Sequence, residues 1–248
     1  MAKRPQHLDD IFANWPYEFG DVAARKVRGS NGRAVLQLRL DMGVMQMEAT
    51  GRPDGLRPEG HDTYYDYLLS LAFEEGPSFE LDGERCMEID REFMQFYHRR
   101  ICWMALREFR SAMADAEHSL ALMDFSSAHA PEDQWAALHE QYRPFVIFHH
   151  TQAAALAEVD ALNPERAVAA IDTGLSRMQA VFDRQEMEDE FEEDELVAKL
   201  REMKEALANH YEIEPPLTEQ LAEAIAHEQY ERAAELRDRI ARRSKRKV

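Results

Sequence analysis

Three arginines in the first sixty residues have the residue type and the setting of an anion site. Arg52 and Arg57 lie in two consecutive Pro/Gly turns, and Arg39 comes shortly before them. Stiff turns hold a side chain in place, and guanidinium groups bind carboxylates and phosphates through paired hydrogen bonds. One hypothesis is therefore a ligand-binding protein that uses Arg39, Arg52 and Arg57. The alternative is that Arg52 and Arg57 pair with carboxylates of an acidic body.

The sequence contains none of the common arrangements of catalytic residues. It has no Gly-x-Ser-x-Gly turn, no His-Glu-x-x-His helix, no Cys-x-x-Cys pair and no glycine-rich phosphate loop. His149 and His150 are adjacent, and neighbouring helical side chains point about 100° apart, which does not suit one metal. Cys102 lies between Ile101 and Trp103, as a small core residue would. We therefore expect no catalytic residue, no metal, no cofactor and no enzymatic activity.

Composition limits the classes of partner. The chain has 248 residues, with 48 acidic against 30 basic side chains and a net charge of -18. This charge opposes non-specific attraction to nucleic-acid backbones and to anionic lipids. We find no signal peptide and no run of about 18 apolar residues. Two cysteines fit a reducing compartment. We expect a soluble cytoplasmic protein that is not a membrane protein and for which nucleic-acid binding is not favoured.

In the N-terminal region, residues 1–60, apolar and polar residues alternate as they do in β-strands. Leu36, Leu38 and Leu40 alternate with polar residues, which is typical of a half-buried strand. The turn at residues 29–32 lets residues 22–28 pair back as a hairpin, and residues 44–48 offer a third strand. We expect a β-hairpin or meander followed by Pro/Gly loops.

Residues 61–212 have helical patterns almost throughout. Two stretches, 106–125 and 163–175, share a layout of small residues that resembles tetratricopeptide-type repeats, and a plain helical bundle is the alternative. Residues 186–195 contain eight acidic side chains, and we expect an amphipathic helix to continue from this run to about Asn209. Prolines 215 and 216 make residues 213–216 a linker between two separately folded parts. The predicted fold class is mainly α with a small N-terminal antiparallel β element, that is, α+β.

Beyond the linker, residues 217–241 have two apolar helical stripes that can fold back on each other as a hairpin. Fewer than about 40 residues rarely bury enough apolar area to fold alone. The hairpin therefore needs another surface, either on the body, on a second copy or on another protein. The residues predicted to bind this partner are Leu217, Leu221, Ile225, Tyr230, Ala233, Ala234, Leu236, Arg237 and Ile240.

The hairpin resembles the UVR motif of the excision-repair proteins UvrB and UvrC. The matching positions are Leu217, Leu221, Ala224, Glu228, Tyr230, Glu231, Ala233, Ala234, Leu236, Arg237, Asp238 and Ile240. In that family the motif is a helical hairpin that joins UvrB to UvrC, so the resemblance implies docking. The helicase motifs of UvrB and the nuclease motifs of UvrC are absent. The whole chain also resembles bacterial proteins that share only this motif.

These patterns lead to a main hypothesis and an alternative. We expect a non-catalytic cytosolic adaptor that docks a protein partner, or a second copy as a homo-oligomer, through the C-terminal hairpin. The alternative is an accessory factor in nucleotide excision repair whose basic tail, residues 242–248, contacts DNA. The side chains that would make this contact are Arg242, Arg243, Lys245, Arg246 and Lys247.

Overall fold

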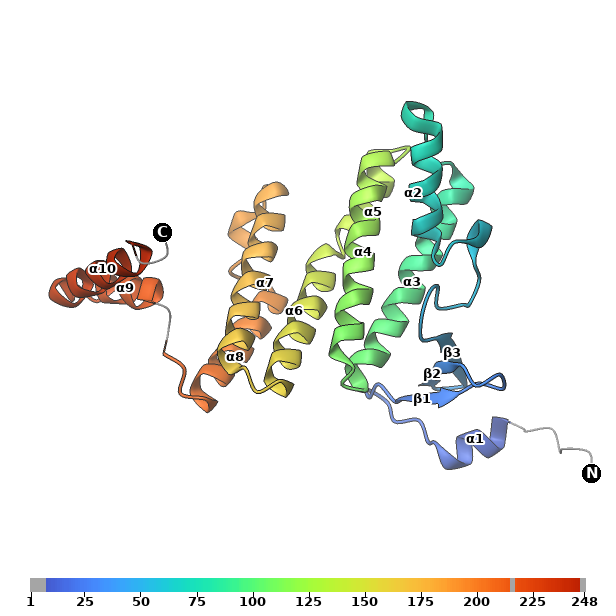
Figure 1. Cartoon of the computed structure of the whole chain (residues 1–248), viewed down its shortest axis with the longest axis horizontal. Helices are drawn as coiled ribbons and strands as arrows, with labels where there is room; N and C mark the ends of the chain where they lie inside the picture. The colour runs from blue at the N-terminus through green and yellow to red at the C-terminus, as the bar shows by residue number, and fades with distance from the viewer. Residues whose placement is uncertain (1–7, 215–216, 246–248) are drawn as a thin grey trace, which may run out of the picture.

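The protein is a row of packed helices with a small sheet near its N-terminal end (Figure 1). The computed structural model describes residues 8–214 and 217–245. The strands are β1 (Ala24–Arg28), β2 (Ala34–Leu40) and β3 (Gly43–Glu48). The helices are α1 (Leu8–Asn14), α2 (Tyr64–Glu75), α3 (Gly83–Ala105), α4 (Phe109–His129), α5 (Asp133–Glu140), α6 (Arg143–Asp160), α7 (Pro164–Arg184), α8 (Glu195–His210), α9 (Leu217–Ala226) and α10 (Tyr230–Lys245). This architecture confirms a mainly α fold with a small antiparallel β element.

The sheet has the order β1-β2-β3 with antiparallel neighbours. Leu36 and Leu38 of β2 are buried in a cluster with Trp103 and other side chains of α3 and α4. The alternating leucines therefore attach the sheet to the helical body. Leu40, which has the same period, is exposed because the strand ends there and the chain turns. Arg39, on the opposite face, is buried rather than solvated.

Helices α3, α4, α6, α7 and α8 pack successively against one another in chain order. The closest approach of α6 and α7 depends on Gly174, because a Cβ atom at that position would lie 2.1 Å from the Thr151 Oγ1 atom. The two stretches of related small-residue layout fall in α4 and α7, and both helices contact α6. A tetratricopeptide-type relationship between them stays a prediction.

Several helices end without glycine or proline. Arg107, Leu162, Glu186, Glu212 and Glu228 each have a positive φ between 53° and 61° just after a helix. After α3, for example, the Arg107 amide donates to the Met104 carbonyl and the Glu108 amide donates to the Trp103 carbonyl. This pair of bonds is the Schellman motif, in which glycine is the usual residue. The stretch from Glu88 to Phe125 is therefore divided into two helices at a point where the sequence shows no break.

The acidic run at residues 186–195 forms a turn between α7 and α8 rather than the start of a helix. It contains one 3-10 turn, Glu188–Glu190, and the helix begins only at Glu195, where the Asp194 carboxylate accepts hydrogen bonds from two amides of the first turn. Phe191 is buried against Phe182 and anchors the turn to α7. The helix then continues to His210, close to the predicted end.

No helix within residues 8–214 and 217–245 is long and apolar enough to cross a membrane.

Candidate interaction hairpin

Helices α9 and α10 pack against each other and share a small core of their own. Ala224, Ala233 and Leu236 are buried there, with Leu217 and Leu221 packed against them. The turn between the helices is closed by the Glu228 amide, which donates to the Ile225 carbonyl, and by the Gln229 amide, which donates to the Ala224 carbonyl. In Figure 1 the hairpin lies apart from the helical body, on the side of α7 and α8.

A second stripe of the hairpin faces outward. Tyr230, Ala234 and Arg237 follow each other at spacings of four and three, which places them on one face of α10, and all three are exposed. Tyr230 is 68% exposed, and Ile225 at the end of α9 is 54% exposed. The large side chains of Tyr230 and Ile225 are therefore exposed to solvent. Ala234 is also exposed, and its small side chain would let another helix approach α10 closely.

The nine predicted partner-binding residues thus divide into two sets. Leu217, Leu221, Ala233 and Leu236 form the core between the two helices, and Ile240 is partly buried. Ile225, Tyr230, Ala234 and Arg237 are exposed, and we call these four residues the outer stripe. The Arg237 guanidinium contacts only its neighbour Asp238, at 3.3 Å, among the described residues. An exposed pair of this kind contributes little to stability, so the Arg237 side chain can take another partner.

The three arginines of the predicted anion site have separate surroundings. Arg39 lies 4.1 Å over the Phe12 ring and donates hydrogen bonds to backbone carbonyls, including those of Trp15 and Gly43. Arg57 pairs with Asp62 on the surface. The structure does not bring the three side chains together.

Arg52 is the most deeply buried of these three arginines, and its partners are carboxylates. Its guanidinium lies 2.6 Å from the Glu88 carboxylate and 3.2 Å from the Glu92 carboxylate. The hydrogen bond from Arg52 lowers the pKa of Glu88, although burial opposes this shift. Glu92 also accepts hydrogen bonds from the amides of Tyr64 and Tyr65 at the start of α2. The Arg52 guanidinium is already paired with carboxylates of the protein. These contacts do not support a ligand site at Arg52, and the ligand-binding alternative stays a prediction.

His118 and His150 lie beside separate carboxylates, and Cys102 is buried in the core. His118 lies 2.9 Å from Glu92, whereas His150 lies 3.2 Å from Glu117, so these two have different partners. Within the described part of the chain, no group of three or more His, Cys, Asp or Glu side chains is placed to hold a metal ion. Burial raises the pKa of the Cys102 thiol to about 12, which keeps it protonated and weakly nucleophilic at neutral pH.

The basic side chains of the tail lie beyond what the structure describes. The side chains of Arg242, Arg243 and Lys245, and all of Arg246 and Lys247, lie outside the described residues. The predicted DNA contact of the tail therefore stays a prediction.

A hollow between α4, α6 and α7 was not predicted from the sequence, because its lining comes from three different helices that only the packing of the body brings together.

The two helices form a compact hairpin with a small core of its own. The family model described as "UvrB/uvrC motif" matches residues 215–245, which includes both helices of the hairpin. The motif is known in DNA repair proteins and mediates protein interactions. This match confirms the resemblance for the hairpin. No curated protein and no solved structure matches the chain.

Proposed function

We propose that this protein is a non-catalytic adaptor that docks a protein partner, or a second copy of itself, through the outer stripe of its C-terminal hairpin. The observation that carries the proposal is the exposure of Ile225 and Tyr230 on a hairpin whose own core is small. Each of these side chains would favour association by roughly 1.5 to 3 kcal/mol if a partner buried it fully. The motif match supports the same role.

The arrangement of the outer stripe indicates the kind of partner surface. Ala234 lies between Tyr230 and Arg237, so a helix can approach closely there while the Tyr230 ring fills a pocket. Arg237 lies at the edge of the apolar contact, where a carboxylate on the partner would pair with it. A helical partner with an apolar stripe and an acidic edge fits these features.

The test uses paired substitutions on the hairpin surface. We expect Ile225→Asp combined with Tyr230→Asp to abolish association, because charges would replace the apolar contact while the hairpin core stays intact. The matched control is Arg232→Asp combined with Arg239→Asp, which adds the same residue type to the opposite face of α10. Leu236→Asp should also abolish association, but by disrupting the hairpin core.

Two measurements read out the result. Sedimentation velocity reports self-association, and affinity capture from the native host with intact and hairpin-deleted protein reports a different partner. Circular dichroism verifies that both surface variants keep their helices. Unchanged association of the Ile225 and Tyr230 variant would contradict the proposal.

A second candidate function is an accessory role in excision repair, and the observation that favours it is the occurrence of the motif in DNA repair proteins. In this case the hairpin engages a repair protein and the basic tail contacts DNA. We expect the full chain to bind DNA with an affinity that falls steeply as salt rises, because phosphate contacts release counterions. A chain that ends at Ile240 should lose this binding, and equal binding by both chains would count against the tail contact.

A further inference from the structure

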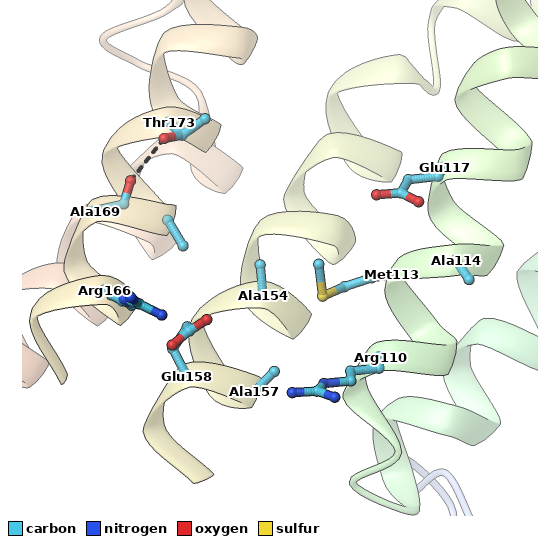
Figure 2. Close-up of a pocket in the computed structure, with 11 residues that line it drawn as sticks. Arg110, Met113, Ala114, Glu117, Ala154, Ala157, Glu158, Arg166, Ala169 and Thr173 are labelled. Atoms are coloured by element: carbon cyan, nitrogen blue, oxygen red, sulfur yellow. Dashed lines mark hydrogen bonds between the residues drawn. The ribbon is translucent and has the colours of Figure 1, made fainter. Parts of the chain in front are cut away.

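A hollow on the helical body, distant from the hairpin in sequence, has the make-up of a ligand site. It lies between α4, α6 and α7 and has a volume of about 480 Å³ (Figure 2). Small-molecule sites typically have volumes of about 300 to 1,000 Å³, with apolar walls and a few polar groups that orient the ligand. The volume of this hollow therefore suits a small metabolite.

Three charged side chains from three different helices face the same space. Arg110 comes from α4, Glu158 from α6 and Arg166 from α7, and Figure 2 shows both guanidinium groups directed toward the Glu158 side of the hollow. Among residues 8–214 and 217–245, neither guanidinium has a hydrogen bond or an ion pair. The Glu158 Oε2 atom is buried and has no hydrogen-bond donor there. Both signs of charge are thus present and without partners.

Several arginines of the body pair with carboxylates. Arg99 makes a two-point contact with Asp115, and Arg143 makes one with Glu140. In a chain with an excess of 18 negative charges, carboxylates are plentiful. What distinguishes the hollow is that, in the part of the chain that the structure describes, two unpaired guanidinium groups and a buried carboxylate oxygen without a donor line the same space.

The rest of the lining is mainly apolar and small. Ala154 and Ala157 of α6, Ala170 of α7 and Met113 of α4 belong to this part of the lining. Such a surface accommodates a short aliphatic group. The polar side chains Glu117 and Thr173 lie further along α4 and α7, and Thr173 already donates to the Ala169 carbonyl.

We propose that this hollow binds a free α-amino acid with an aliphatic side chain. The ligand carboxylate accepts hydrogen bonds from Arg110 and Arg166, the ligand ammonium donates to Glu158, and the side chain lies against the alanines and Met113. A simple anion would leave the buried Glu158 oxygen without a hydrogen-bond donor, and a simple cation would leave both arginines without an acceptor. A zwitterion satisfies all three groups. This role goes beyond docking through the hairpin and does not depend on it.

The test is calorimetric titration of the full chain with L-leucine. We expect saturable binding of one leucine per chain. The comparison compounds are 4-methylpentanoate, which lacks the ammonium group, and L-leucinamide, which lacks the carboxylate. Each should bind at least about tenfold more weakly, because 4-methylpentanoate leaves Glu158 without its partner and L-leucinamide leaves both arginines without theirs.

Variants of the protein locate the site. Arg110→Gln, Arg166→Gln and Glu158→Gln should each weaken leucine binding by about tenfold or more. Arg184→Gln, which changes the same residue type in the last turn of α7, should bind as the wild type does. Arg110 and Arg166 are exposed, so their variants are expected to fold even if the half-buried Glu158 variant does not.

Three results would overturn the proposal. The first is no saturable binding at millimolar leucine. The second is equal binding of leucine and 4-methylpentanoate, which would indicate a plain anion or apolar site. The third is leucine binding that both arginine variants retain, which would place the ligand elsewhere.

Discussion

Arg100 and His149 are a buried pair in which two basic groups meet without a carboxylate between them. The Arg100 Nε donates to the His149 Nδ1 at 3.2 Å, and a second nitrogen of Arg100 donates to the Ser119 hydroxyl. Burial lowers the pKa of Arg100 to about 10, and burial together with the charge of Arg100 lowers the pKa of His149 to about 4. His149 is therefore neutral at physiological pH and serves as a hydrogen-bond acceptor.

This contact predicts a loss of stability in mild acid. In the unfolded chain the imidazole takes up a proton near pH 6.5, whereas the folded chain resists until about pH 4. The unfolded state binds more protons in this window, so the free energy of unfolding falls as pH decreases from 6.5 toward 4. The contribution of His149 at pH 5 is at most about 2 kcal/mol.

Urea unfolding at pH 7 and at pH 5 measures this effect. The His149→Gln variant should show a smaller difference between the two pH values than the wild type, because it cannot take up the proton. The exposed His210, changed to Gln, is the matched control and should keep the wild-type difference. An unchanged difference in the His149→Gln variant would show that other groups cause the acid sensitivity.

At the scale of the elements, several helices end in a residue whose positive φ strains the backbone. Leu162, 85% exposed, follows α6 with a φ of 61°. The left-handed conformation costs an ordinary L residue roughly 1 to 2 kcal/mol, whereas glycine adopts it freely. The bonds from the Leu162 amide to Val159 and from the Asn163 amide to Glu158 maintain the turn. The same turn orients α7 relative to α6, and so shapes the hollow that both helices line.

We expect Leu162→Gly to stabilise the protein by about 1 kcal/mol, because glycine removes the strain and the exposed leucine side chain adds little packing. The measurement is the free energy of unfolding in urea. Ala161→Gly, one residue earlier and at a φ of -82°, should destabilise or have no effect, since that position needs no left-handed conformation. Destabilisation by Leu162→Gly would mean that the leucine makes contacts that outweigh the strain.

In the whole molecule, the body and the hairpin have separate cores. The buried residues of the hairpin are Ala224, Ala233 and Leu236, and the side chains packed on them come from the hairpin itself. The largest cluster of the body runs from α4 through α8 and includes Ile171, Met178 and Leu200. Neither cluster draws on the other, so the body should be stable without packing from the hairpin.

This separation predicts that a chain ending at Glu214 unfolds with nearly the same thermal midpoint as the full chain, within about 2 °C. The same truncation should remove any association that depends on the outer stripe. Differential scanning calorimetry of both chains gives the midpoints, and sedimentation velocity gives the association state. A fall of about 4 °C or more would show that the hairpin packs on the body.

Local pattern was sufficient for the elements that have a clear amphipathic period. The hairpin was predicted from the spacing of Leu221, Ala233 and Leu236, and β2 from the alternation of Leu36 with Leu38. In both cases the period of apolar residues along the element indicates its secondary structure and its buried face, whichever surface that face packs against. The end of α8 was also predicted closely, for the same reason.

The tertiary structure alone decided where the charged groups and helix ends lie. Arg52 meets Glu92 forty residues later, and Arg110 faces a hollow with Glu158 and Arg166, because helices distant in sequence pack side by side. The turn at Arg107 has no glycine or proline signal, and the structure stabilises it by the hydrogen bonds that close the turn and by the packing of α3 against α4. The amino-acid sequence by itself determined the amphipathic faces and the net charge. Which faces meet, and which charges are buried together, depended on long-range packing that no local pattern encodes.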